Sequence, residues 1–253
     1  MTELLVPARF CGPPSSGNGG WTAGALAGLL DHGTTADHAT AWPTIQVTLR
    51  RPPPLDTPLP VTDGVAVDGD SVVAAAEVVD RAVVPVAAVA PDEAERAAAA
   101  YAGLVSHPFP TCFACGTARD DGLRIFPGRV DDGVDGRVRV AAPWTPDPSV
   151  AEDWHAYVDD RRRASLAATW AALDCVGGWA GDLAERLMVL GRMTARIDGL
   201  PILGVPHVVM GGARGSDGRK TFTASTLYDA DGRVVAVAEH VWFAVDPADF
   251  GVG

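Results

Sequence analysis

The sequence has almost no lysine. Lys220 is the single one among 253 residues, and 32 acidic residues outnumber 20 lysines and arginines, for a net charge of −12. This imbalance excludes a general surface for nucleic acid or for an anionic membrane. An anionic small ligand would need a local group of basic residues. The candidate groups are Arg50 with Arg51, Arg161 to Arg163, and Arg214 with Arg219 and Lys220.

Long apolar runs are absent too. No stretch of about 18 consecutive apolar residues occurs, and the start, MTELLVPARF, lacks the basic segment and apolar region of a signal peptide. Four cysteines, Cys11, Cys112, Cys115 and Cys175, are too few and too unevenly placed for a disulfide scaffold, which indicates free thiols. With 47 % hydrophobic residues, we expect a globular protein in the cytoplasm.

Glycine is abundant in one apolar segment, SGNGGWTAGALAGLL, which runs from Ser16 to Leu30. A glycine inside a helix costs about 1 kcal/mol relative to alanine. A helix from Gly19 to Leu30 therefore needs something to lie very close to it. One interpretation is tight packing against a sheet and a second helix; the other is a ligand at the first turn, where backbone N–H groups are unpaired.

The two halves of the chain match at an offset of 146 residues. Residues 47–61 fall on 193–207 without a gap. With small insertions, residues 71–80 meet 220–229, and residues 81–90 meet 233–242. In each half a helix of small residues, at Gly19 to Leu30 and at Arg163 to Gly181, precedes several segments with the alternation of strands.

Turns rich in Asp and Gly separate these segments, at VDGDS, RGSDGR and YDADGR. One helix followed by an antiparallel meander, repeated once, predicts an α+β chain with two units, residues 1–105 and 106–253. The linker falls at Ala90 to Pro110, as an alanine-rich helix and a proline-bounded crossing. A hairpin from Gly122 to Trp144 opens the second unit.

This arrangement resembles the double hotdog fold of acyl-CoA thioesterases, in particular the type II family. The segments that carry the resemblance are RFCGPPSSGNGGW, VTLRRPPPL and WAALDCVGGWA. It implies two units whose sheets join and whose helices lie side by side, with thioester sites at the seam. It also implies hydrolysis of an acyl-CoA or an acyl-carrier-protein thioester, without a metal or redox cofactor. Such chains often associate further, so a single chain and a homo-oligomer both stay open.

The resemblance suggests roles for the first turn of the glycine-rich helix. Asn18 would cap the helix or add a side-chain donor. The amides of Gly19 and Gly20 would hold the oxyanion of the thioester, a contribution of roughly 3 to 4 kcal/mol per donor in other acyl-transfer enzymes. Packing alone is the other explanation for these glycines.

Asp174 lies in the apolar helix segment WAALDCVGGWA. The offset of 146 puts Gly28 at the matching position, so only one half has the acid. In the family, an acid on this helix acts as the general base or positions water. Gly177 and Gly178 are then predicted to lie at the substrate; otherwise they would help a surface Asp174 to reach solvent.

The partners of Asp174 are predicted from the last strand and its neighbour. His240 stands where the family has a glutamine, and Glu239 is the alternative, because successive strand residues face opposite ways. His240 could also be purely structural. Thr194 is the nearest hydroxyl to the family's strand hydroxyl, although the closest register puts Gly191 there. Arg162 and Arg163 would meet the phosphates of coenzyme A, or lie on a solvated helix face.

The segment HPFPTCFACG contains a Cys-x-x-Cys pair, Cys112 and Cys115, with His107 before it. These residues are three ligands of a zinc site, which needs four, so Cys11 or Cys175 would have to join from far along the chain. We predict a reduced pair and no metal.

Two other functions fit a hotdog chain. A protein that binds an acyl thioester without turnover is favoured by the missing strand hydroxyl and by histidine in place of glutamine. A dehydratase or hydratase would need a string resembling D-x-N-P-x-H, which does not occur.

Overall fold

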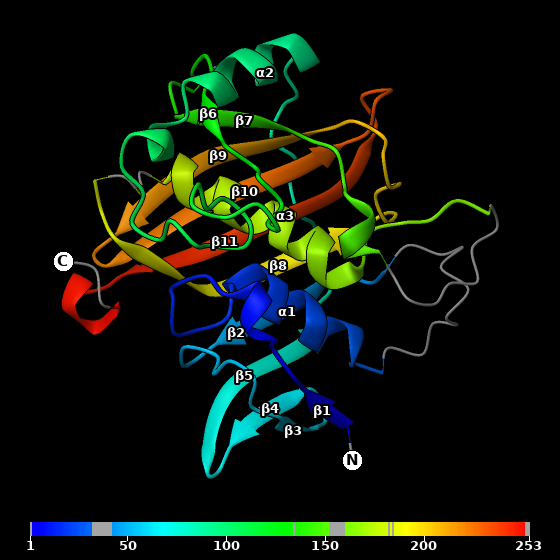
Figure 1. The fold of residues 1–253 in the computed structure, drawn as a ribbon, viewed down its shortest axis with the longest axis vertical. Coiled ribbons are helices and arrows are strands. Elements are labelled where there is room, and N and C mark those ends of the chain that lie inside the picture. The colour runs from blue at the N-terminus through cyan, green and yellow to red at the C-terminus, as the bar shows by residue number, and fades with distance from the viewer. Residues whose placement is uncertain are drawn as a thin grey trace.

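The computed structural model describes residues 2–31, 42–133, 135–151, 160–181, 183 and 185–250, with the exception of the Asp249 side chain. Eleven strands in this part of the chain form one antiparallel sheet, in the order β1-β3-β4-β5-β2-β8-β11-β10-β9-β7-β6. Two helices, α1 and α3, lie side by side on one face of the sheet (Figure 1).

The elements fall into two groups along the chain. The N-terminal half contains β1 (Thr2–Leu4), α1 (Gly19–Gly28), β2 (Ile45–Leu49), β3 (Leu59–Thr62), β4 (Val65–Asp68) and β5 (Ser71–Val78). The connection contains α2 (Pro91–Ala99). The C-terminal half contains β6 (Gly128–Arg129), β7 (Arg139–Trp144), α3 (Leu166–Ala180), β8 (Met188–Ile197), β9 (His207–Asp217), β10 (Lys220–Tyr228) and β11 (Val234–Ala244). Short 3-10 helices occur at Ala8–Phe10, Ala102–Leu104, Pro148–Val150 and Pro247–Phe250.

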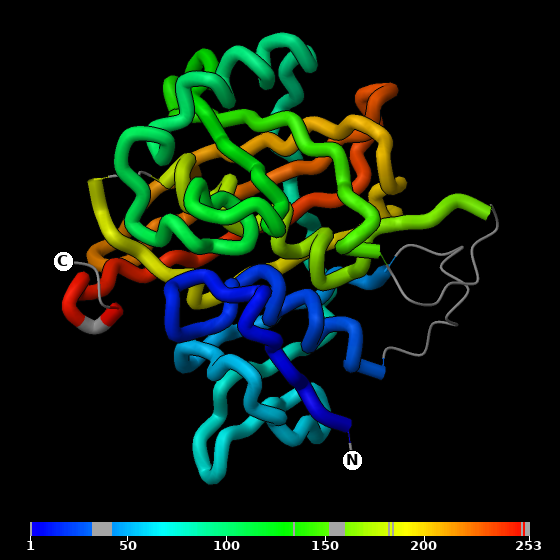
Figure 2. Tube along the Cα trace, viewed as in Figure 1, coloured from blue at the N-terminus to red at the C-terminus, as the bar shows by residue number. Residues whose placement is uncertain are grey.

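The two halves have the same strand order. From the middle of the sheet outwards, the N-terminal half runs β2, β5, β4, β3, β1, and the C-terminal half runs β8, β11, β10, β9, β7, with β6 added at the edge. The halves occupy different ends of the molecule, blue to cyan and green to red in Figure 2. They join where β2 pairs with β8, so a single sheet continues from one half into the other.

The offset of 146 residues is confirmed at the centre of this junction. Val47 of β2 pairs directly with Met193 of β8, and these are residues that the offset matches. Gly24 of α1 packs directly on Trp170 of α3, another matched pair. Two matched elements that contact each other through matched residues are related by an approximate twofold axis. The chain therefore forms within itself the contact that two identical units would make.

α1 begins at Gly19 as its sequence predicts, whereas α3 begins at Leu166, three residues after its predicted start at Arg163. Asn18 caps α1 and accepts from Trp21 N at 2.8 Å, and Ser165 caps α3 and accepts from Ala168 N at 3.0 Å. α1 and α3 cross in very close contact. A Cβ atom on Gly24 would lie 2.6 Å from the Cβ of Trp170. Close packing of the helices therefore accounts for part of the glycine content.

The predicted correspondence between strands is wrong in the later part of the repeat. The β5 segment corresponds in position to β11, since each is the direct neighbour of a central strand, and not to β10 as the sequence comparison predicted. Residues 81–90 form no strand. Both edges of β10 and β11 are already paired, so no edge beside them is free for this segment. Two valines of this segment, Val83 and Val86, are buried instead.

Residues 81–99 cross the face of the C-terminal sheet that lies opposite α3. Val86 N donates to Thr226 Oγ1 at 2.8 Å, and Tyr228 Oη donates to Val86 O at 2.6 Å. The predicted alanine-rich helix is α2, and it packs on β6, β7 and β9. The turns at Asp68, Asp217 and Tyr228 and the β6–β7 hairpin form as predicted.

Within the described ranges, no helix has the length and apolar character needed to cross a bilayer.

Candidate active site

A cavity of about 400 Å³ lies at the seam between the two halves. It is bounded by the loop before α1, the end of β2, the Cys-x-x-Cys turn, one turn of α3, the start of β8 and the end of β11. Its walls are largely apolar, with Leu49, Leu183, Met188, Leu190, Trp242 and Phe243 among them. Asp174 and Asn18 are polar residues on the same wall.

Asp174 is 2 % exposed and is held by the start of the other helix. Its Oδ2 accepts from the Gly20 backbone N at 2.8 Å and from Asn18 Nδ2 at 3.0 Å. Gly20 is required here, because a Cβ on it would lie 2.4 Å from the Cβ of Asp174. The two helices thus meet at a carboxylate on α3 and a helix N-terminus on α1, an arrangement that stabilises negative charge.

The second oxygen of Asp174 is buried and has no hydrogen-bond partner in the described part of the chain. Burial raises the pKa of Asp174 to about 7, although the N–H of Gly20 and the amide of Asn18 oppose this rise. Asp174 is therefore a buried acid whose pKa lies near neutral pH. Its burial excludes a surface role, and its place in the middle of α3 excludes a cap at the end of that helix.

The two helix amides predicted to hold an oxyanion have different surroundings. Gly20 N–H donates to Asp174, so it is already paired. Gly19 lines the cavity, and its N–H donates to no other described residue. One amide of the first turn is thus available for a carbonyl oxygen in the cavity.

His240 is not brought to the cavity. Its ring packs against Gly177 of α3, where a Cβ would lie 2.6 Å from Nδ1, and it contacts Thr223 Oγ1 at 3.2 Å. Burial lowers the pKa of His240 to about 4, so the ring is neutral at pH 7. Thr223 also accepts from Trp242 Nε1 at 2.9 Å. These contacts make His240 part of a buried polar group between α3 and the sheet.

Glu239 and Thr194 lie on the opposite face of the sheet from α3. Glu239 forms an ion pair with Arg81 of the crossing segment. Thr194 Oγ1 donates to Gln46 Oε1 at 3.4 Å. Neither residue borders the Asp174 cavity; both border a separate hollow on that opposite face. Alternation along β11 correctly predicted that His240 and Glu239 lie on opposite faces of the sheet. It could not show whether either side chain borders the cavity.

The remaining predicted residues lie away from Asp174 or serve packing. Gly178 contacts the Trp242 ring, as Gly177 contacts His240, so both glycines let α3 approach β11. Arg162 and Arg163 precede α3, more than two helical turns from Asp174. Arg163 Nη1 donates to Leu200 O at 3.0 Å. None of these four residues borders the cavity.

Arg50 and Arg51 do border the cavity, immediately after β2. Both are exposed, and neither has an ion-pair partner among the residues that the structure describes. Composition marks them as one of three basic groups, yet the residues predicted to meet the phosphates of coenzyme A were Arg162 and Arg163. Their position directly after the central strand β2 is the sequence signal that could have identified them as cavity residues.

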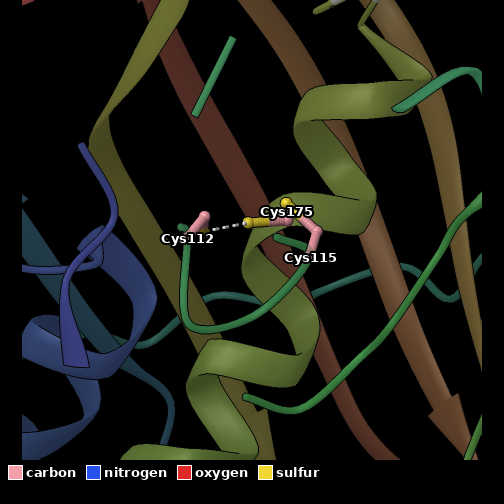
Figure 3. Close-up of side chains that lie close together, drawn as sticks. All are labelled: Cys112, Cys115 and Cys175. Atoms are coloured by element: carbon pink, nitrogen blue, oxygen red, sulfur yellow. Dashed lines mark hydrogen bonds between the residues drawn. The ribbon is translucent and has the colours of Figure 1, made fainter. Parts of the chain in front are cut away.

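Three of the four cysteines converge on the same cavity (Figure 3). The Sγ atoms of Cys112, Cys115 and Cys175 all lie within 4.8 Å of one another, and Cys112 Sγ is 3.6 Å from Cys175 Sγ. All are buried and none is in a disulfide. Sequence reasoning treated Cys175 as remote, although it follows Asp174 directly and so shares its turn of α3.

The thiol cluster is not chemically uniform. The pKa of Cys112 lies well below its usual range, because the thiols of Cys115 and Cys175 and the backbone N–H groups of Cys115 and Ala114 stabilise its thiolate. Burial raises the pKa of Cys115, and the neighbouring Cys112 raises that of Cys175. Cys112 is thus the first of the three to ionise.

Neither a protein-family model nor a curated protein sequence matches this chain. Solved structures do match, over 96 % of the chain. A tesB protein of Mycobacterium avium subspecies paratuberculosis has 14 % identity and a TM-score of 0.58, with 91 % of that chain covered. A hotdog-fold protein of unknown function from Alicyclobacillus acidocaldarius has 15 % identity, a TM-score of 0.57 and 92 % coverage.

A third match is a protein assigned as a thioesterase II from Thermobifida fusca, with 14 % identity, a TM-score of 0.55 and 91 % of that chain covered. At such low identities the likeness shows the fold. The chain therefore has the hotdog fold, which it shares over 96 % of its length with these three proteins.

Proposed function

We propose that this chain is a double hotdog protein that hydrolyses an acyl thioester at the Asp174 cavity. The observation that carries the proposal is a buried carboxylate held on one oxygen by Asn18 and Gly20, with its other oxygen unpartnered at an apolar cavity. The proposal takes the two units as residues 1–105 and 106–253. The crossing segment of the first unit packs on the sheet of the second. A cytoplasmic location and further association of chains stay predictions.

In the proposed reaction, Oδ1 of Asp174 accepts a proton from a water molecule in the cavity. The resulting hydroxide attacks the thioester carbonyl, and the N–H of Gly19 donates to the oxygen on which negative charge develops. The carbon–sulfur bond then breaks, and the leaving thiolate takes the proton from Asp174. The products are a carboxylic acid and a free thiol, and the chain's own residues are sufficient for each step.

Asn18 and Gly20 act as positioning residues in this scheme. Their two hydrogen bonds occupy Oδ2 and leave Oδ1 without a protein partner, as the scheme requires. His240, Glu239, Thr194, Gly177, Gly178, Arg162 and Arg163 have no part in it, because each lies outside the cavity wall. Acyl-CoA or an acyl-carrier-protein thioester is the substrate class: apolar walls suit the acyl chain, and Arg50 with Arg51 suits phosphates at the mouth.

The second candidate is binding of the acyl thioester without turnover. It is favoured by the use of Gly20 N–H as a donor to Asp174, which leaves Gly19 as the one first-turn amide for an oxyanion. A weaker oxyanion site slows hydrolysis much more than it weakens binding.

The test is thiol release from short, medium, long and aromatic acyl-CoAs, measured with a chromogenic thiol reagent. Asp174→Asn keeps an oxygen that can accept from Gly20, so the fold should persist. We expect release to fall about 10² to 10³-fold, the usual worth of a general base. The matched control, Glu239→Gln, neutralises an acid on the opposite face and should leave the rate unchanged.

Two results would reject hydrolysis at this site. One is equal release by the Asp174→Asn variant and the native protein. The other is no release from any thioester while acyl-CoA still raises the melting temperature, which would establish the binding protein.

A further inference from the structure

The Cys-x-x-Cys turn is built to hold two sulfur atoms at a fixed separation. Cys112 N donates to Phe109 O at 2.9 Å, and Gly116 N donates to Cys112 O at 2.8 Å. A Cβ on Gly116 would lie 2.5 Å from the carbonyl oxygen of Cys112, so the turn requires glycine directly after the second cysteine. The backbone therefore orients both thiols toward the same point on α3, where Cys175 lies (Figure 3).

The geometry of the three thiols matches three corners of a tetrahedral metal site. Tetrahedral zinc with thiolate ligands has Zn–S distances of about 2.3 Å, which corresponds to S···S separations of about 3.8 Å. Cys112 and Cys175 are at 3.6 Å, and the set as a whole lies within 4.8 Å. A shift of at most about 1 Å in one side chain would complete this arrangement.

Nitrogen groups surround the sulfur atoms. Asn18 Nδ2 lies 3.6 Å from Cys112 Sγ and 3.9 Å from Cys175 Sγ, and His107 Nε2 lies 3.4 Å from Cys115 Sγ. Every sulfur in the set thus has an N–H group near it. Donors of this kind orient ligands and stabilise thiolates around bound metals. Three buried neutral thiols would not need them.

His107 is a neighbour of the set and not its fourth ligand. Phe109 N donates to His107 Nδ1 at 2.9 Å, so the ring proton is on Nε2. That N–H lies 3.1 Å from Cys115 O, to which it can donate. A protonated ring nitrogen cannot bind a metal, so the fourth position must be filled from elsewhere. Because all three cysteines line the cavity, that position faces it.

We propose that Cys112, Cys115 and Cys175 bind a zinc ion in the wall of this cavity, with the fourth coordination position open to ligands that enter the cavity. Thiolates favour zinc over magnesium and calcium. Three protein ligands and an open position are typical of zinc sites at which chemistry occurs, whereas structural sites are closed by four. The site is thus not the structural zinc site that sequence spacing brought into consideration.

The test measures metal and does not depend on hydrolysis. We expect the full chain, purified without chelator, to contain roughly one zinc per molecule by elemental analysis, as a single tetrahedral site requires. The apoprotein should bind Co²⁺ with thiolate-to-cobalt charge-transfer absorption and tetrahedral visible bands. A mercurial reagent should release the zinc as three thiols are modified, a measurement that needs no variant.

Variants separate the cluster from other cysteine chemistry. Cys112→Ser and Cys175→Ser should lose most of the metal. Cys11→Ser is the matched control, because Cys11 is also buried but donates to Thr111 O outside the cluster. It should keep the metal, as should His107→Gln. Addition of 2-mercaptoethanol should shift the cobalt spectrum by occupying the open position.

Three results would overturn the proposal. The first is an absence of zinc and of any cobalt spectrum in folded, fully reduced protein. The second is equal metal loss in Cys11→Ser and Cys112→Ser. The third is loss of metal in His107→Gln together with a cobalt spectrum that a small thiol leaves unchanged, since this would show a closed four-ligand site.

Discussion

The two ends of the α1–α3 pair are related by the repeat, yet only one of them has a chemical group. At one end, Gly20 of α1 meets Asp174 of α3. At the other, Gly28 meets Leu166, and the offset matches Gly28 to Asp174 and Leu166 to Gly20. Equivalent contacts between the helices thus enclose a buried carboxylate at one end of the pair and an apolar side chain at the other. The frame is symmetric, and the chemistry depends on a few side chains placed on it.

The same contrast extends to the sheet. Ala76 of β5 pairs with Val47 as His240 of β11 pairs with Met193, so alanine stands at the position equivalent to the buried histidine. The C-terminal half thus has both the acid and the polar group behind it. Packing thus requires glycine at position 20, where the acid lies, and not at position 28, and the polar residues belong to one site.

The largest effect is expected when one methyl group is added at each end of the helix pair. Gly20→Ala places a Cβ 2.4 Å from the Cβ of Asp174, whereas Gly28→Ala meets nothing closer than 3.6 Å. We expect Gly20→Ala to lower the free energy of unfolding by about 1 to 3 kcal/mol or more. Gly28→Ala should change it little, or raise it by at most about 1 kcal/mol. Urea unfolding measures both; equal losses would show that the two ends pack alike.

The buried histidine should make stability depend on pH. The pKa of His240 is about 4 in the folded chain, below its ordinary value of 6.5. Between these values the unfolded chain binds the extra proton, so the contribution of His240 to stability is complete above pH 6.5 and is lost as the pH drops to about 4. The loss is at most about 3 kcal/mol.

His240→Gln should remove this one contribution, so that between pH 7 and pH 5 the variant should lose less unfolding free energy than the native protein, as measured by urea unfolding of both. The buried Asp174, whose raised pKa contributes with the opposite sign, titrates in both proteins and cancels in the comparison. A slope that is unchanged in the variant would mean that His240 is not buried in its neutral form.

Substitution of each helix cap should separate an effect on stability from an effect on activity. Asn18 and Ser165 each cap one helix, and only Asn18 also donates to Asp174. Asn18→Ala and Ser165→Ala should each cost about 1 kcal/mol of unfolding free energy. Thioester hydrolysis should fall roughly tenfold or more in Asn18→Ala alone, because one charged hydrogen bond is lost. A similar fall in Ser165→Ala would point to general loosening of the helices.

The smallest effect concerns the arginines. Arg50→Gln with Arg51→Gln should raise KM for acyl-CoA about three- to tenfold at low salt and less at high salt, because the charges are exposed. The matched pair, Arg162→Gln with Arg163→Gln, should leave KM unchanged. An acyl-pantetheine, which lacks the nucleotide phosphates, should show no change with either pair. If KM rose in the Arg162 and Arg163 variant alone, the phosphates would bind at the start of α3 instead.

The sequence by itself determined the local elements and their repetition. Apolar alternation, capping by Asn18 and Asp-Gly turns act within a few residues, so the helices, the hairpins and the central match of Val47 with Met193 could be predicted. The helix N-terminus opposite an acid was predictable as well, because both features lie in short apolar segments.

Only the tertiary structure decided which of these groups meet. Gly20 N–H pairs with Asp174 instead of remaining free, His240 faces α3 instead of the cavity, and Cys175 joins a turn more than sixty residues earlier in the chain. Strand alternation gives two faces without saying which one borders a cavity. Contacts between distant segments depend on how whole elements pack, and no local pattern records that packing.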